Sequence, residues 1–389
     1  MLAGELTPCE QPTVSPVPSR VGSQQSVFRG FPDGSRVELL DVPEGRMVIR
    51  ETDGSEREVQ FSYESDGSHI LSVHQGPDGA IYGSTGHPLR VYRLDPSIGD
   101  LTNQGLRDEN GHLNAMTVQR DKLYAAMYGS GVLFEYDVTQ PWADRDEHDP
   151  NPRELGRAHP DICRPHALLA HPDGRHVIMG GTPGYGYTGG GLYIYDLELG
   201  SGEVISHTEL VPDQSTNCLI ALPDGNLLGG TTIMPGTGGE QLATEAELYI
   251  FDWQDRSIAW REVILPGRAR IMDLVEGPGG LVHVFAVDST YFVFDPAERV
   301  VVHDEPLREA YGQLAGAQAP RVMIMGPDGF IYTVFTGAIV RIDPGSFSHE
   351  KLGGIPAHAN AGIALVDGRI YFAASSRLWS YQIPSAQTD

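Results

Sequence analysis

The stretch RPHALLAHPDGRHVIMGGTPGYGYTGGGLYIYD, residues 164–196, contains one complete structural unit. Two short apolar runs flank Asp173-Gly174, and a glycine-rich loop then leads to an alternating run at residues 192–196. An Asp-Gly pair suits a two-residue hairpin, because both turn positions take positive φ angles. The stretch therefore predicts a strand, a hairpin, a second strand, a long loop and a third strand.

The unit recurs along the chain. Seven hairpin turns can be aligned, and their first residues are 39 to 55 residues apart. The turns are Asp78-Gly79, Asp121-Lys122, Asp173-Gly174, Asp224-Gly225, Gly279-Gly280, Asp328-Gly329 and Asp367-Gly368. Repeats of about 40–50 residues with several short strands each are typical of β-propellers. The predicted fold class is all-β, a seven-bladed β-propeller.

The two ends of the repeat array predict how the ring closes. The last repeat has little chain left for a fourth strand, and residues 57–63 alternate as a strand does before the first repeat. We expect this N-terminal strand to complete the last blade, which removes exposed sheet edges. Residues 36–50 hold two more strand-like runs, so an eight-blade count is the alternative. Residues 1–26, rich in Pro, Ser and Gln, are expected to form a disordered or extended arm, and residues 27–389 a single propeller domain.

The composition limits which partners and which cellular compartment can be expected. The net charge of −25 argues against nucleic acid, whose phosphates would be repelled. No apolar run is long enough to span a membrane, and no signal-peptide core is present, so we expect a cytoplasmic or mature secreted monomer. The three cysteines form no metal-binding spacing, and Cys163 and Cys218 are expected to be buried thiols.

Counting back from each turn defines rings of first-strand residues that we expect to line a central channel. Nine residues before the turn lie His69, His112, Arg164, Ser215, Arg270, Ala319 and His358; seven before it lie Leu71, Asn114, His166, Asn217, Met272, Arg321 and Asn360. The ring five residues before the turn is mostly apolar. A polar mouth above an apolar floor predicts a ligand pocket. The alternative is that these polar groups only satisfy one another or channel water.

The loops between second and third strands share this face, which adds further candidates. Arginines can bind a carboxylate bidentately, so the arginines of the rings are candidates for substrate binding, together with neighbouring polar residues. The substrate-binding candidates are Arg164, Arg270, Arg321, Asn114, Asn217, Asn360 and Tyr187. The acid–base candidates are His87, His112, His166, Tyr128 and Tyr185. The rings lack the carboxylates of a two-carboxylate glycosidase or of a lactonase metal cage. The remaining sets are expected at the surface (His171, His176, His207, His283, His303) and in the inter-blade core (Tyr193, Tyr195, Tyr249, Phe292, Phe294).

Four segments carry a family resemblance: GPDGAIYGSTGHP (76–88), DICRPH (161–166), MGGTPGYG (179–186) and DSTYFVFD (288–295). With them, the chain resembles the seven-bladed L-rhamnose-α-1,4-D-glucuronate lyases of bacteria and fungi. The resemblance implies β-elimination on a small acidic oligosaccharide, with His87 as the catalytic base and His112 as the second match. Tyr128 or Tyr185 would then be the acid, and arginines would stabilise the enolate. The resemblance also implies calcium in the central cavity, with ligands that the sequence leaves unknown.

Two other classes of function remain open. One is a non-catalytic propeller that binds a ligand or a protein at the polar mouth. The other is a different enzyme on the same scaffold, a lactonase-like hydrolase or a quinone-dependent oxidoreductase. A quinone enzyme needs a tryptophan over the channel, whereas Trp142, Trp253, Trp260 and Trp379 all fall on outer strands or loops.

Overall fold

The computed structural model describes residues 17–18, 26–27, 30–41, 45–62, 67–86, 88–106, 111–143, 147–316 and 321–384. Contacts divide the chain into two compact units, residues 1–67 and residues 68–389, where the sequence predicted one domain from residue 27. Within the described ranges, no helix is long and apolar enough to cross a membrane.

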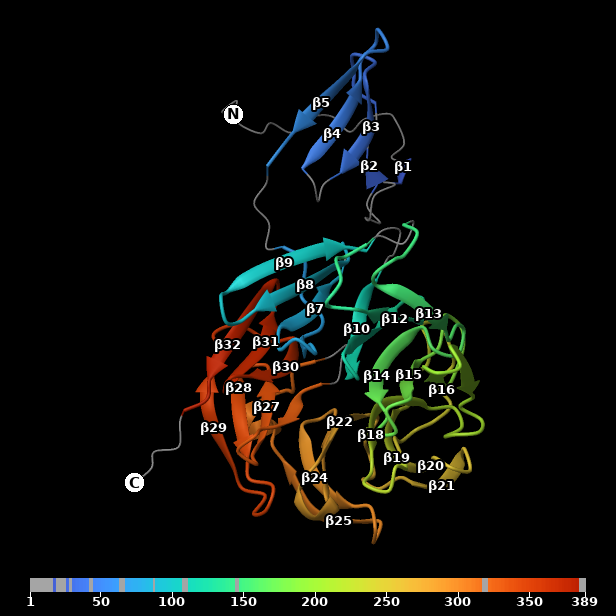
Figure 1. The fold of residues 1–389 in the computed structure, drawn as a ribbon, viewed down its shortest axis with the longest axis vertical. Helices are drawn as coiled ribbons and strands as arrows, with labels where there is room; N and C mark the ends of the chain where they lie inside the picture. The colour runs from blue at the N-terminus through green and yellow to red at the C-terminus, as the bar shows by residue number, and fades with distance from the viewer. Residues whose placement is uncertain are drawn as a thin grey trace. The chain divides into compact units, whose positions relative to one another are not determined.

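The second unit is an all-β propeller of seven antiparallel sheets, numbered here as blades 1 to 7 in chain order (Figure 1). Blades 1 to 4 comprise β6 (His74–Gln75), β7 (Ile81–Thr85), β8 (Arg90–Asp95) and β9 (Asp100–Gly105); β10 (His112–Gln119), β11 (Lys122–Tyr128), β12 (Val132–Tyr136) and β13 (Arg153–Arg157); β14 (Arg164–Ala170), β15 (His176–Thr182), β16 (Leu192–Asp196) and β17 (Ser201–Ile205); and β18 (Ser215–Ala221), β19 (Leu227–Thr232), β20 (Leu248–Asp252) and β21 (Ser257–Glu262). Blades 5 to 7 comprise β22 (Ile271–Glu276), β23 (Val282–Ala286), β24 (Thr290–Asp295) and β25 (Val300–Pro306); β26 (Met323–Met325), β27 (Ile331–Phe335), β28 (Ala338–Ile342) and β29 (His349–Gly354); and β30 (Ala361–Val366), β31 (Arg369–Ala374) and β32 (Arg377–Gln382). A 3-10 turn, η1 (Pro278–Gly280), and one helical turn, α1 (Arg308–Tyr311), lie between strands.

The third strand of each blade supplies much of the core between blades. The predicted core residues are confirmed: Tyr193 and Tyr195 are each 5% exposed, and Tyr249, Phe292 and Phe294 are fully buried. Phe292 and Phe294 pack with residues of blade 4, so their cluster joins two neighbouring blades. Strand side chains alternate between the two faces of a sheet, and in a propeller both faces meet another blade.

The hairpin turns differ from the predicted two-residue form. In the Pro-Asp-Gly turns, only the glycine takes a positive φ, as at Gly79 and Gly225. The Gly79 amide donates to the Gly76 carbonyl, which closes a turn over residues 76–79. Gly79, the last residue of this turn, has left-handed backbone angles, as in a three-residue hairpin loop. Both positions have positive φ at Asp367-Gly368, 49° and 69°, and at Gly279-Gly280, 73° and 80°. In the Pro-Asp-Gly turns the proline ring holds φ near −65°, and the following Asp, which has a Cβ, does not take the positive φ that Gly279 takes after Pro278.

The ring closes by direct contact between blades 7 and 1 (Figure 1). The Ile70 amide donates to the Ser375 carbonyl at 2.9 Å, and Ile70 and Ile81 share a buried cluster with residues of blade 7. Blade 7 has three strands among the described residues. The predicted completion of this blade by residues 57–63 is therefore wrong for the described part of that segment.

The first unit contains the strand that was expected in blade 7. Here β3 (Arg36–Asp41), β4 (Arg46–Arg50) and β5 (Glu56–Gln60) form a separate three-stranded sheet, and β1 (Val17–Pro18) pairs with β2 (Ser26–Val27). The short turn at Asp53-Gly54 lets β5 pair with β4. Closing so short a loop costs less chain entropy than pairing with a strand at the far end of the chain.

Candidate functional site

A bulge interrupts the first strand of several blades at the same point. The ladder shifts at Asn114, His166, Asn217 and Met272, which all belong to the ring seven residues before the turn. A bulge adds one residue to a strand and turns its side chain away from the regular alternation. The sequence predicted that the same alternate residues face the channel along the whole first strand. Because each bulge reverses the alternation, that prediction holds only on one side of the bulge.

The predicted asparagines lie between blades. Asn114 donates to the Pro165 carbonyl at 2.6 Å, Asn217 to the Ile271 carbonyl at 2.7 Å, and Asn360 to the Ile70 carbonyl at 2.6 Å. Pro165 and Ile271 belong to the first strand of the following blade, and Ile70 precedes β6, the first strand of blade 1. These amides join neighbouring blades at the channel wall, the structural use that the sequence left open as an alternative to substrate binding.

The candidate histidines separate in the structure. His112 is 4% exposed, stacks on Tyr128 with 4.6 Å between ring centroids, and contacts the Asn114 amide oxygen through Nε2 at 2.9 Å. His166 is half-buried, and its Nε2 lies 3.4 Å from the Thr182 hydroxyl. His87, the best match for the catalytic base, lies outside the described residues.

Arg164 lies at the centre of the residues that the prediction grouped together. Its guanidinium carbon is 5.5 Å from the ring centroid of Tyr128 and 5.5 Å from that of Tyr185. Both distances fall within the range of cation–π attraction. Its Nη2 also donates to the Thr237 hydroxyl, which belongs to the next blade. The three elements that carry these groups all end on one face, because antiparallel strands return the chain to the same end of the blade.

Two long loops, residues 183–191 of blade 3 and 233–247 of blade 4, together form what we call the rim. Three hydrogen bonds join them: the Gly186 amide to the Thr237 carbonyl at 3.0 Å, the Gly236 amide to the Tyr187 carbonyl at 3.0 Å, and the Thr188 hydroxyl to the Glu240 carbonyl at 2.6 Å. A Cβ on Gly236 would lie 1.9 Å from the Gly184 carbonyl oxygen, so this approach requires glycine. The rim exposes Tyr185 (77%), Tyr187 (54%), Met234 (46%) and Leu242 (53%).

Arg270 lies beside the same blade 4 loop. Its Nε donates to the Thr232 hydroxyl at 3.3 Å, and burial lowers the pKa of its guanidinium. Two threonines at the ends of residues 232–237 thus each accept one hydrogen bond from an arginine. Among the described residues, no carboxylate lies within ion-pair distance of Arg164 or Arg270.

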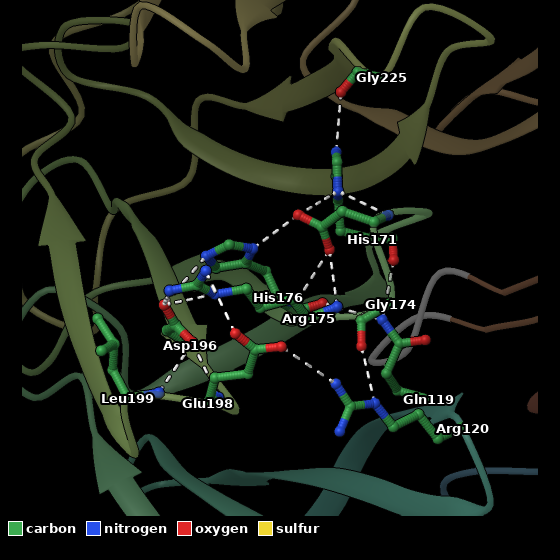
Figure 2. A network of polar contacts seen from close by, with 11 residues as sticks. Gln119, Arg120, His171, Gly174, Arg175, His176, Asp196, Glu198, Leu199 and Gly225 are labelled. Carbon is green, nitrogen blue, oxygen red and sulfur yellow. Dashed lines mark hydrogen bonds and ion pairs between the residues drawn. The ribbon is translucent and has the colours of Figure 1, made fainter.

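On the opposite face, which carries the hairpin turns, the charged side chains around Arg175 form a network of ion pairs (Figure 2). Arg175 binds the Asp196 carboxylate through Nε at 2.9 Å and through Nη2, and these bonds hold the pKa of Asp196 well below its usual range. Arg175 and Arg120 also reach Glu198, at 3.3 and 3.9 Å. Every arginine drawn in Figure 2 therefore has a carboxylate partner.

Two histidines expected at the surface are buried. His171 is 3% exposed, binds the Gly225 carbonyl through Nε2 at 2.8 Å and stacks on Trp253 at 3.9 Å. His283 is fully buried beside the Tyr291 hydroxyl, 2.6 Å from its Nδ1. The prediction was wrong because these side chains are covered by neighbouring strands and blades, which proximity to a turn does not reveal.

A cavity of about 490 Å³ occupies the central channel toward the hairpin face. Its lining includes three of the candidate site residues, Arg321, His166 and Asn217, and also His74, Asp273 and Cys218, which sequence reasoning missed. His74 and Asp273 lie four and six residues before their turns, positions of the opposite parity to the predicted rings. If the prediction had reversed the alternation after the bulge, it would have placed His74 and Asp273 among the residues that face the channel.

Burial shifts the pKa values of three titratable groups in this cavity. The Asp273 carboxylate accepts backbone amides of Val322 at 2.7 Å and Met323 at 2.9 Å, while burial raises its pKa to about 7. Burial, with a smaller effect from the Arg321 charge, lowers the pKa of His74 to about 3. Burial raises the pKa of the Cys218 thiol well above its usual value. At neutral pH the His74 ring and the Cys218 thiol are therefore uncharged.

The described residues contain no cluster of side chains suited to bind a metal ion. Within the described ranges, no three His, Cys, Asp or Glu side chains lie together so that they could hold a metal ion. Cys163 and Cys218 are buried and unpaired, as predicted. Calcium remains a prediction.

The comparisons with known proteins identify the fold. No family model and no curated protein matches the chain. Among solved structures, it is similar to the β-propeller domain of Myceliophteria thermophila Cps50 (Swd1), with a TM-score of 0.60, 14% identity, and coverage of 82% of this chain and 98% of that one. The chain is therefore a β-propeller. None of these comparisons supports the lyase family, and the activity, the oligosaccharide partner and the monomeric state remain predictions.

Proposed function

We propose that this propeller is a non-catalytic binding module that docks a partner protein on the rim of blades 3 and 4. Arg164 and Arg270 would take acidic side chains of the partner, while exposed rim residues such as Tyr185 take apolar ones. The observation that carries the proposal is Arg164, held between Tyr128 and Tyr185 with no carboxylate of its own among the described residues.

The unpaired arginines are unusual in their electrostatic setting. The chain carries a net charge of −25, and on the hairpin face Arg120 and Arg175 bind carboxylates. An arginine presents five N–H donors in a planar fork that matches a carboxylate. One hydrogen bond to a threonine hydroxyl leaves most of those donors of Arg164 and Arg270 for a ligand.

The exposed side chains of the rim have the composition of a binding hot spot. Tyr, Arg and Met are enriched in protein interfaces, and Tyr and Arg contribute much of the measured binding energy. The rim exposes two tyrosines, a methionine and a leucine. Hydrogen bonds between the two loops hold their backbones before a partner arrives, which reduces the entropy lost on binding.

The lyase hypothesis has weaker support from the described residues. His112 is buried against Tyr128, and Asn114, Asn217 and Asn360 contact backbone carbonyls of the next blade. The arginines that would neutralise a uronate carboxylate also suit an acidic peptide. Carbohydrate binding is therefore the alternative outcome of the test below.

The test is a screen of an immobilised peptide library in which acidic and apolar positions vary. We expect selection of peptides that combine Asp or Glu with aromatic or aliphatic residues. Arg164→Ala should weaken the best peptide by roughly tenfold or more, because a charge-assisted contact at an interface centre is lost. Leu199→Ala is the matched control, since Leu199 is 72% exposed on the hairpin face.

Each outcome decides between the classes. Binding that shows no acidic preference, or that survives Arg164→Ala unchanged, would contradict the proposal. Absence of peptide binding together with turnover of a rhamnosyl-glucuronate glycan would restore the lyase hypothesis.

A further inference from the structure

We propose that the channel cavity is a second binding site, separate from the rim, for a small organic carboxylate with an apolar body, held by Arg321. The juxtaposition behind the proposal is a single guanidinium on the wall of a cavity that aliphatic and polar side chains line together.

The cavity has the dimensions of a small-molecule site. Its volume of about 490 Å³ lies within the roughly 300–1,000 Å³ that ligand pockets occupy. Residues of all seven blades line it, so its shape is set by the whole ring. Leu168, Leu219, Ile324 and Ile363 contribute an apolar surface that would contact the body of the ligand.

Arg321 supplies the anion-binding group. Its Nη2 donates to the Leu168 carbonyl at 2.7 Å, which extends the side chain from blade 6 to blade 3. Among the described residues this is the hydrogen bond that fixes the guanidinium, and no carboxylate lies within ion-pair distance. An arginine has five N–H donors, so most remain for a ligand in the cavity.

Asp273 is the other ionisable group that controls charge here. Its carboxylate is directed to backbone amides: Oδ2 accepts from Val322 and Met323, and Oδ1 accepts from Leu274 at 3.0 Å. It therefore affects Arg321 through space without a direct ion pair. The other titratable groups on the cavity wall are His74, His166 and Cys218.

The charge arrangement predicts a pH dependence. Above neutral pH, ionised Asp273 offsets the charge of Arg321, whereas its protonation at lower pH leaves the guanidinium uncompensated. His74 does not add a charge in this interval, because its pKa is lowered to about 3. A carboxylate ligand should thus bind more tightly at pH 6 than at pH 8.

The experiment is calorimetric titration of the full chain with benzoate, and with benzamide as the neutral analogue of the same shape. Benzoate should bind and benzamide should bind at least roughly tenfold more weakly, since the charge-assisted contact is missing. Equal affinity for the two compounds, or no binding of benzoate by the wild type, would overturn the proposal.

Three variants and one control variant locate the site and test its charge. Arg321→Gln should reduce benzoate affinity roughly tenfold or more, because it removes the charge and keeps a polar side chain, whereas Arg377→Gln, at an exposed position of β32, should change nothing. Ile324→Trp should also block binding by filling the cavity without removing charge. Asp273→Asn should abolish the difference between pH 6 and pH 8. Unchanged affinity in Arg321→Gln and Ile324→Trp would place benzoate elsewhere and contradict the inference.

Discussion

The two faces of blade 3 use arginine in opposite ways. On the hairpin face, Arg175 binds the Asp196 carboxylate, and the surrounding histidines are buried or paired. On the rim face, Arg164 lies between two tyrosines, and among the described residues its guanidinium has a threonine hydroxyl as its only polar partner. The difference teaches that residue type alone does not mark a binding site. A better indication of a binding site is a charged side chain that the fold holds in place without a partner of opposite charge.

The largest expected effect concerns stability at the hairpin face. His171→Ala should lower the free energy of unfolding by about 3 kcal/mol, because it leaves a cavity beside Trp253 and removes the bond to Gly225. Urea unfolding measures this change, and exposed His148→Ala should remain within about 0.5 kcal/mol of the wild type. A stable His171→Ala variant that lost peptide binding would reverse the roles of the two faces.

The asparagines between blades should behave like the hairpin face. Asn217→Ala should cost about 2 kcal/mol of unfolding free energy, because the buried Ile271 carbonyl loses the Asn217 amide donor and keeps the weaker Cys218 thiol at 3.6 Å. Its affinity for the selected peptide should not change. Asn103→Ala, at an exposed position of β9, is the control for the substitution itself. If Asn217→Ala folds with full stability but binds no ligand, the original substrate-binding prediction for this residue would be right.

Asp273 should make stability depend on pH. Its pKa is raised in the folded protein to about 7 from the ordinary 3.8, so the unfolded chain releases this proton first as the pH rises. The contribution of Asp273 to the free energy of unfolding therefore falls between about pH 4 and pH 7, by at most roughly 1.4 kcal/mol for each pH unit. Urea unfolding across this interval should show a flatter profile for Asp273→Asn. An identical slope in the variant would contradict the raised pKa.

The smallest effect is expected from the edge of the rim. Tyr185→Ala should weaken the selected peptide about three- to tenfold, because it removes exposed contact area and one of the two rings beside Arg164. Fluorescence anisotropy measures the change, and Tyr185→Phe should retain most of the affinity. A loss in Tyr185→Phe equal to that in Tyr185→Ala would assign the effect to the hydroxyl group instead of the ring.

The blades could be predicted from sequence because their signals are local. A turn with Asp-Gly and an alternating third strand recur within each repeat, and both depend on residues close in the chain. The gathering of Tyr128, Arg164 and Tyr185 also follows from topology, since antiparallel strands bring their ends to one face. The detailed geometry of the turns did not follow, because the Asp of the Pro-Asp-Gly turns does not take a positive φ.

The failures of prediction concern partners that are distant in sequence. Residues 57–63 alternate as a strand should, but alternation does not specify a pairing partner, and β5 pairs with β4. The channel-facing parity failed because bulges shift the register of the first strands, which placed Asp273 outside the predicted rings. His171 appeared exposed because its cover, Trp253, comes from another blade.

The measurement that tests the account most directly is a pair of values for Arg164→Ala: its unfolding free energy in urea and its affinity for the selected acidic peptide. The account predicts a free energy within about 1 kcal/mol of the wild type and an affinity lower by roughly tenfold or more. A variant that loses several kcal/mol of stability yet binds the peptide as the wild type does would show that Arg164 supports the fold, and would contradict the division between the two faces.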